Sequence, residues 1–265
     1  MSSNSKRPHA PRRYAPTPAR ALCACAALAC ALLWPALAAR AQQRYTRSFA
    51  PRGNVSLVLK NRSGLIEVRG WERNEIRVTA VMDSPAARFT PTLTEDGLTI
   101  NVASDNRGRE DVGDVTFKIL VPYDATVDLE TTRGNITVRN VRGRLVSAHV
   151  YAEGDIELTD IRATQVVAVN VMGDIVFDAE LLRGGSYELT STQGNINMRI
   201  TPGTGFTLTA TAPYTRNINI GGFANMGNFN YQGDNRRVVG TVGDGSSKIQ
   251  LTNLRGAISL APRGR

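Results

Sequence analysis

The distribution of apolar and polar residues along this 265-residue chain predicts β-strands almost throughout. In several short segments of the first half, large apolar residues alternate with polar ones at a period of two, as they do in a half-buried strand. These segments are 55–59, 66–68, 76–78, 98–102 and 115–119. Glycines separate them, and no stretch of the sequence sustains the 3.6-residue period of an amphipathic helix. The pattern therefore predicts an all-β protein.

The middle of the chain repeats one short phrase four times. The phrase is glycine, then Asn or Asp, then isoleucine, a variable residue and a large apolar residue, and its copies are 134–138, 154–158, 173–177 and 194–198. By subtraction, the glycines are 20, 19 and 21 residues apart. A repeat of about 20 residues with two short strands is typical of a solenoid, in which each unit buries its apolar edge against its neighbours. We therefore expect a single-stranded β-solenoid, a β-helix-like stack of short strands.

Stacking of the repeats predicts continuous apolar columns inside the solenoid. In each copy, the isoleucine and the apolar residue two positions later should point inward, while the residue between them points outward. The glycine should form the corner at a positive φ. The segment 145–151 fits two registers, and we favour the one that places Val146, Ala148 and Val150 inside and leaves His149 exposed.

Beyond residue 200 the repeat loses its regular spacing. The segments 217–220, 248–251 and 257–260 keep the alternation of apolar and polar residues without all of the punctuation. The stretch 221–234 is rich in Gly and Asn, and we interpret it as an inserted loop.

The first 41 residues have the pattern of a secretory signal peptide. A basic segment without acidic residues, Met1–Arg20, precedes an apolar run over 21–37 that ends in small residues. We expect cleavage after Ala41, which leaves Gln42 as the new N-terminus. The alternative is an uncleaved signal anchor, because the apolar run approaches the roughly 17–25 residues that span a bilayer.

Removal of this leader changes the chemistry that the chain can support. All three cysteines lie within it, so the exported chain has no disulfide, no thiolate nucleophile and no cysteine-based metal site. The leader also carries six basic residues and no acid, so the net charge falls from +9 to +3. The remaining charge gives no support to a nucleic-acid partner. We expect no stable membrane insertion once the leader has been removed.

Several features in a fixed order resemble a bacterial family of putative adhesins, an exported domain of unknown function built of repeated β-strands. The features are Gly70-Trp71, Glu75-Ile76-Arg77-Val78, Val121-Pro122, Leu129-Glu130-Thr131-Thr132, the Gly-Asn/Asp-Ile repeats and Gly240-Thr241-Val242-Gly243-Asp244-Gly245. The resemblance covers most of the chain after the leader. It implies an exported, stacked β fold, and it supplies no activity, since fold does not imply function.

Stacking also predicts a column of polar side chains at the corners of the repeats. The column contains Asn135, Asp155, Asp174 and Asn195, and it makes the two aspartates neighbours. Paired carboxylates could bind Ca²⁺ or serve as the acids of a carbohydrate-active enzyme. However, Asn and Asp after glycine are common turn formers whose side chains bond to nearby backbone. We favour this structural role.

Other catalytic chemistry has little support in the sequence. His149 is the only histidine after the leader, so a Ser-His-Asp arrangement has one possible base, and histidine-rich zinc sites are excluded. We therefore expect no catalytic residue, no bound metal and no cofactor.

Two groups of aromatic residues are candidates for recognition. Phe223, Phe229 and Tyr231 could bind a glycan or protein, or could fold back over the open end of the solenoid. Trp71 and Tyr214 could stack on a sugar, but Trp71 lies between two predicted strands, and we expect it to cover the end of the core.

These observations predict a signal peptide at 1–41, an N-terminal β-rich capping region at 42–125 and a continuous repeat-containing solenoid at 126–265. The function that we favour is a non-catalytic structural or binding module of the cell envelope, adhesin-like, at the periplasm or cell surface. Its partner would be an envelope protein or glycan. The alternatives are a carbohydrate-active enzyme or Ca²⁺-binding protein that uses the stacked carboxylates, and a periplasmic accessory or sensor of an envelope stress system.

Overall fold

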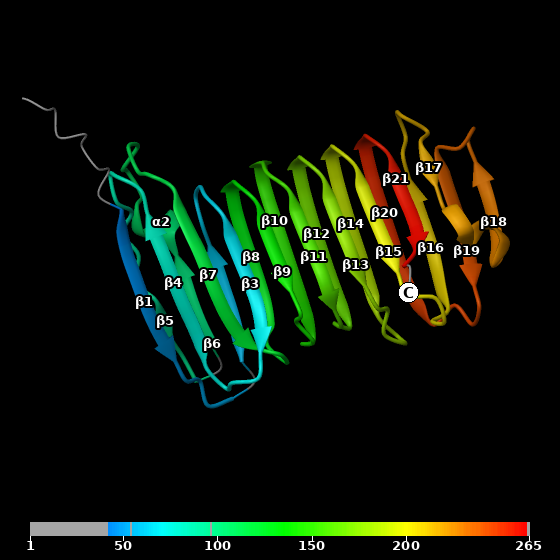
Figure 1. The fold of residues 1–265 in the computed structure, drawn as a ribbon. Coiled ribbons are helices and arrows are strands. Elements are labelled where there is room, and N and C mark those ends of the chain that lie inside the picture. Colours follow the sequence, from blue (N-terminus) through cyan, green and yellow to red (C-terminus); the bar gives the residue numbers. More distant parts are fainter. Residues whose placement is uncertain (1–41, 54, 96, 264–265) are drawn as a thin grey trace, which may run out of the picture. The chain divides into compact units, whose positions relative to one another are not determined.

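The computed structural model describes residues 42–53, 55–95 and 97–263. The predicted signal peptide, including Ala41, lies outside them, and Gln42 is the first described residue. More than half of this part of the chain forms strands, which make two sheets that lie face to face (Figure 1). The predicted all-β, solenoid-like fold is confirmed.

One sheet, sheet A, contains ten strands in the described residues. Across the sheet these are β1 (Gln43–Phe49), β4 (Ile76–Met82), β7 (Val115–Pro122), β3 (Ile66–Trp71), β9 (Ile136–Arg139), β11 (Ile156–Ile161), β13 (Ile175–Ala179), β15 (Ile196–Ile200), β21 (Ile258–Pro262) and β17 (Ile218–Asn219).

The second sheet, sheet B, has eleven strands among the same residues. Their order is β18 (Gly227–Gln232), β19 (Arg237–Val242), β16 (Phe206–Thr211), β20 (Ser247–Arg255), β14 (Ser186–Gln193), β12 (Gln165–Met172), β10 (Leu145–Glu153), β8 (Thr126–Arg133), β2 (Ser56–Lys60), β6 (Gly97–Asn101) and β5 (Thr92–Leu93). A four-residue helix, α2 (Val102–Asp105), follows β6.

Each repeat forms one coil, with a strand in sheet B, a glycine corner and a strand in sheet A. Successive coils pair in parallel and in register, so that Ile156 is opposite Ile136 on one side and Ile175 on the other. The predicted inward residues of all four copies are buried, at 0–1% exposure. Val146, Ala148 and Val150 are buried as well, and His149 points away from the core, which confirms the favoured register. The interior of the stack is therefore a set of apolar columns.

The corners require glycine because neighbouring coils approach closely there. Gly154 and Gly173 have φ values of +150° and +130°, which side chains rarely adopt, in line with the predicted positive φ. A Cβ atom on Gly173 would lie 2.2 Å from the carbonyl oxygen of Gly154. The same close approach recurs from Gly134 to Gly194, since each Cβ would lie within 2.3 Å of the preceding corner's carbonyl oxygen.

Two coils near the ends of the described chain are inserted into the stack. Strand β2 lies between β6 and β8, and β3 lies between β7 and β9. At the other end, β20 lies between β14 and β16, and β21 between β15 and β17, so red strands stand among yellow and orange ones (Figure 1). The order of the coils therefore departs from the order of the sequence at both ends.

The stretch 221–234 is not an inserted loop, and that prediction is wrong. It contains a short 3₁₀ helix, η1 (Gly221–Asn225), and strand β18, which pairs antiparallel with β19. Phe223 is buried, and its ring meets that of Phe206 edge-to-face with 5.3 Å between the centroids. The many Gly and Asn residues suggested a loop. They obscure the spacing of Phe229 and Tyr231 at every second position, which is typical of a strand.

Candidate functional site

The polar column at the corners is brought together as predicted, and it serves the backbone. In each case one side-chain oxygen accepts a hydrogen bond from a backbone N–H of the next coil. The backbone N–H of Asp155 donates to Oδ1 of Asn135 at 2.9 Å, and that of Asp174 donates to Oδ1 of Asp155 at 2.9 Å. The backbone N–H of Asn195 donates to Oδ1 of Asp174 at 2.7 Å, and that of Ala257 donates to Oδ1 of Asn195 at 3.0 Å. These bonds satisfy donors that the turn leaves without a strand partner. The column therefore supports the stack.

The surroundings of this column offer little that favours metal chemistry. A shallow pocket of 690 Å³ lies at the same corner, and its lining includes Asn135, three acidic residues (Asp114, Glu153 and Asp155) and four corner glycines. Within residues 42–263, apart from the two undescribed positions, no three His, Cys, Asp or Glu side chains gather as metal ligands would.

The aromatic candidates divide into buried and exposed members. Phe223 is buried and packs over the end of the core, which is the second of the two predicted alternatives. Tyr231 on β18 is 52% exposed. The expectation for Trp71 is wrong, because β3 is an interior strand of sheet A and the ring lies on its outer face. The Trp71 ring lies beneath the guanidinium groups of Arg73 and Arg77, at 5.2 and 4.9 Å from its centroid.

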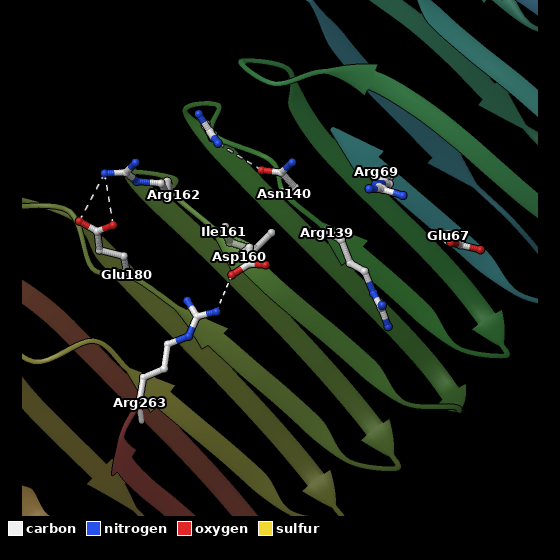
Figure 2. A pocket seen from close by; sticks show the side chains of 10 residues that line it. Glu67, Arg69, Arg139, Asn140, Asp160, Ile161, Arg162, Glu180 and Arg263 are labelled. Atoms are coloured by element: carbon white, nitrogen blue, oxygen red, sulfur yellow. Dashed lines mark hydrogen bonds and ion pairs between the residues drawn. The ribbon is translucent and has the colours of Figure 1, made fainter. Parts of the chain in front are cut away.

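A groove rich in arginine crosses the outer face of sheet A (Figure 2). Its volume is 530 Å³, and it lies where strands β3, β9 and β11 end. The lining residues are Glu67, Arg69, Arg139, Asn140, Arg142, Asp160, Ile161, Arg162, Glu180 and Arg263. Five of these ten are arginines and three are acidic, so the lining carries a positive charge.

The solenoid stacks four of the arginines in two pairs. Arg69 and Arg139 are directly opposite each other in the parallel register of β3 and β9. Arg142 and Arg162 occupy corresponding corner positions, since the N–H of Arg142 bonds to Tyr123 of one coil and the N–H of Arg162 bonds to Val141 of the next. Neighbouring strands lie about 4.8 Å apart, so each pair brings two positive side chains together.

One member of each pair has an acidic partner and the other has none in the described residues. Arg139 contacts both carboxylate oxygens of Glu157 at 3.0 and 3.1 Å, and Arg162 lies 3.2 Å from a carboxylate oxygen of Glu180. No acidic side chain among these residues lies within 4.0 Å of the guanidinium of Arg69 or Arg142. The positive charge of the groove is therefore concentrated on these two arginines.

The other end of the groove is closed by a network of ion pairs. Arg263 contacts Asp160 at 2.5 Å and Asp178 at 2.9 Å, and Asp178 also contacts Arg199 at 2.9 Å. The hydrogen bond to Asp160 raises the pKa of Arg263 above its ordinary value, so this side chain stays charged. The network ties β21 to β11 and β13, and its charges are already compensated.

Sequence reasoning missed this groove because arginines on a strand are common on any charged surface. The signal was the position within the repeat: Arg69 and Arg139 each follow a corner glycine, Gly64 or Gly134, by five residues. The unit at Gly64 lacks Asn or Asp after its glycine, so it does not match the repeated phrase.

Solved structures of bacterial proteins are among those similar to this chain. The chain is similar to a putative cell adhesion protein from Clostridium sporogenes, with 12% identity, a TM-score of 0.49, and coverage of 84% of this chain and 100% of that one. It is also similar to a putative adhesin from Bacteroides fragilis, with 9% identity, a TM-score of 0.36, and coverage of 84% and 99%. No curated protein matches the chain.

Among the described residues, no helix is long and apolar enough to cross a membrane.

A protein-family model, that of the domain of unknown function Toastrack DUF4097, matches residues 55–261 of the chain. These residues include nearly every strand of both sheets. The chain therefore belongs to the Toastrack DUF4097 family.

Proposed function

We propose that this protein is an exported, non-catalytic binding module of the bacterial cell envelope, adhesin-like, and that it holds its ligand in the arginine groove of sheet A. The leader-like first 41 residues support export. The partner is an envelope component, either a glycan or a protein.

The observation that carries this proposal is the side-by-side placement of Arg69 and Arg139 on paired strands. Like charges directly opposite each other on a sheet destabilise it. Glu157 compensates Arg139, and Arg69 has no acidic partner among the described residues. A stack selected for stability alone would place a neutral or acidic residue at one of these positions, so a ligand that contacts the groove explains the arrangement.

A binding role also fits the way in which the groove is built. Arg69 and Arg139 project from paired strands whose inward residues are fully buried, so the positions of their Cα atoms are fixed by the core. Binding surfaces on rigid elements hold their groups more accurately than surfaces on loops. No nucleophile accompanied by a base is found among the lining residues.

The test is the binding of labelled protein, expressed from the full-length sequence, to isolated envelopes of the bacterium that produces it. We expect saturable binding that Arg69→Glu reduces and that Arg237→Glu, on the outer part of sheet B, leaves unchanged. Both substitutions change the net charge by the same amount, so the comparison isolates position from charge. Absence of saturable binding, or equal loss in both variants, would contradict the proposal. Turnover of envelope polysaccharides by the wild-type protein would favour the carbohydrate-active alternative instead.

A further inference from the structure

We infer that the ligand of the sheet A groove is an anionic glycan, a polysaccharide whose carboxylate, phosphate or sulfate groups pair with Arg69 and Arg142. The inference rests on the proposed function and gives the chemistry of its partner. It follows from four properties of the groove: its uncompensated charge, the fixed position of Arg142, the polarity of its lining and its direction across the strands.

The charge of the groove calls for an anion at two places. Arg69 and Arg142 lie beside Arg139 and Arg162, and only these latter two have acidic partners among the described residues. A guanidinium presents a planar fork of N–H donors that matches a carboxylate, phosphate or sulfate group in a bidentate manner. An anionic group on Arg69 would relieve the repulsion with Arg139 and supply the acidic partner that Arg69 lacks among the described residues.

One of the two proposed donors, Arg142, is held before a ligand arrives. The guanidinium of Arg142 lies over the ring of Tyr123 at 4.9 Å from its centroid, and it bonds to the side chain of Asn140 at 3.5 Å. Arg139 is fixed by its two contacts with Glu157. Figure 2 shows Arg69 and Arg139 on adjacent strands, with Asn140 beside them and Arg263 on the opposite side of the groove. Ordered donors lose less conformational entropy on binding.

The lining favours a glycan over a lipid. Ile161 is the single apolar residue that lines the groove within the described chain, and its side chain is 1% exposed. An acyl chain would therefore have no apolar surface to contact. Asn140, Glu67 and Asp160 offer oxygen and nitrogen atoms beside the arginines, and these are the groups that bond to sugar hydroxyls.

The direction of the groove suits a linear polymer. Its lining residues come from β3, β9 and β11 and from the segment after β13, which occupy consecutive positions in sheet A. Three strand spacings amount to a path of about 14 Å, which is longer than one monosaccharide. A chain of sugars that contacts Arg69 and Arg142 at β3 and β9 would therefore extend along the groove over more than one residue.

The experiment measures binding of the purified full-length product to defined probes by isothermal titration calorimetry. The anionic probes are polygalacturonate and dextran sulfate, and the neutral probe is dextran. Inorganic phosphate and phosphatidylglycerol vesicles test the free anion and the lipid surface. The groove variant is Arg69→Gln with Arg142→Gln, and the control is Arg44→Gln with Arg237→Gln, which removes two exposed arginines elsewhere.

We expect at least one anionic polysaccharide to bind, with affinity that falls as salt rises and with no detectable binding of dextran. Loss of two charge-assisted contacts should weaken binding by about 100-fold in the groove variant, while the control changes by less than about threefold. Melting temperatures of both double variants should stay close to that of the wild type, so that loss of binding cannot be ascribed to unfolding.

Four outcomes would overturn the inference. Equal weakening in both double variants would mean diffuse charge attraction, and binding of vesicles alone would mean a lipid ligand. Binding of phosphate without the polymers would mean a simple anion site. Failure of both anionic polymers while the protein still binds its own envelope would reject the anionic glycan and leave the proposed binding function in place. If the envelope also fails to bind, the proposed function fails with it.

Discussion

Replacement of Gly173 by alanine tests the corner geometry that the whole stack shares. The new Cβ atom would lie 2.2 Å from the carbonyl oxygen of Gly154 and 2.8 Å from a side-chain oxygen of Asp155. Both neighbours are fixed by pairing with adjacent coils, so the clash cannot be relieved by rotation of one flexible side chain. The corner must open, and the register of two strands changes with it.

The expected magnitude has two parts. A side chain held at φ +130° costs about 1–3 kcal/mol, and insertion of a methyl group into a closely packed site costs about another 1–3 kcal/mol. Gly184→Ala is the matched control, because Gly184 has φ +76° and no atom within 4 Å of its Cβ position. Gly184→Ala should therefore lose only the stability that the positive φ costs, without the cost of the clash.

Urea unfolding followed by circular dichroism would measure the free energy of unfolding of the wild type and both variants. Gly173→Ala should be less stable than Gly184→Ala by about 1–3 kcal/mol, which corresponds to a difference in melting temperature of about 2–12 °C. Equal destabilisation by the two substitutions would show that the corners are not in close contact, and the stacking described above would be wrong.

Four further substitutions or truncations probe other parts of the fold. Ile175→Asp buries an unpaired charge and should abolish folding. Val176→Asp, on the outer face of the same strand, should leave a protein that circular dichroism shows to be folded. A folded Ile175→Asp protein would contradict the inward column. Asp155→Ala should lose about 0.5–1.5 kcal/mol of stability in urea unfolding because the backbone N–H of Asp174 loses its acceptor, while Asp155→Asn should stay near the wild type. Added Ca²⁺ should not raise the melting temperature of the wild type. A clear Ca²⁺-dependent rise would instead indicate a metal site. Deletion of 244–265 removes the coil between β14 and β16, so the unfolding transition should lose its cooperativity, and a merely shortened but cooperative unit would refute the insertion. Burial raises the pKa of Tyr187, so its contribution to stability is complete below the unfolded pKa of about 10 and falls as pH rises through the higher folded pKa. Tyr187→Phe should therefore be about 1–3 kcal/mol less stable than the wild type at pH 7, because the N–H of Leu182 loses its acceptor. The variant should also lose less stability than the wild type between pH 9 and 12 in urea titrations, and an unchanged pH profile would contradict this.

The central part of the fold could be predicted from the sequence because local rules determine it. The alternation in 156–158 and 175–177 identifies which side chains face inward, and the repeat spacing of about 20 residues sets the coils one above another. The glycine before each pair marks the corner. All three signals lie within a few residues of the positions that they describe.

The insertion of the end coils could not be predicted in the same way. Strand β20 resembles other strands of the repeat, and nothing in its own residues says that it pairs with β14 and β16 rather than following β19. That choice depends on which open edges the rest of the stack presents. Pairing between strands distant in sequence is a property of the whole chain.

The same distinction explains what was found and missed at the candidate sites. The corner column was predicted as a set because Asp155 and Asp174 occupy the same place in a recognisable phrase. Its role became clear only from the hydrogen bonds to the next coil. The groove stayed hidden because the register of β3 and β9 brings Arg69 and Arg139 together across 70 residues of sequence.

The most direct measurement is a map of backbone amide chemical shifts during titration of the isotope-labelled protein with polygalacturonate oligomers. If sheet A holds the ligand, the largest shifts should cluster at Arg69, Arg139 and Arg142 and along the strand ends beside them, while the outer face of sheet B stays unchanged. The Arg69→Gln, Arg142→Gln variant should show no such cluster. Shifts centred on sheet B or spread evenly over the surface would contradict a binding role for the groove.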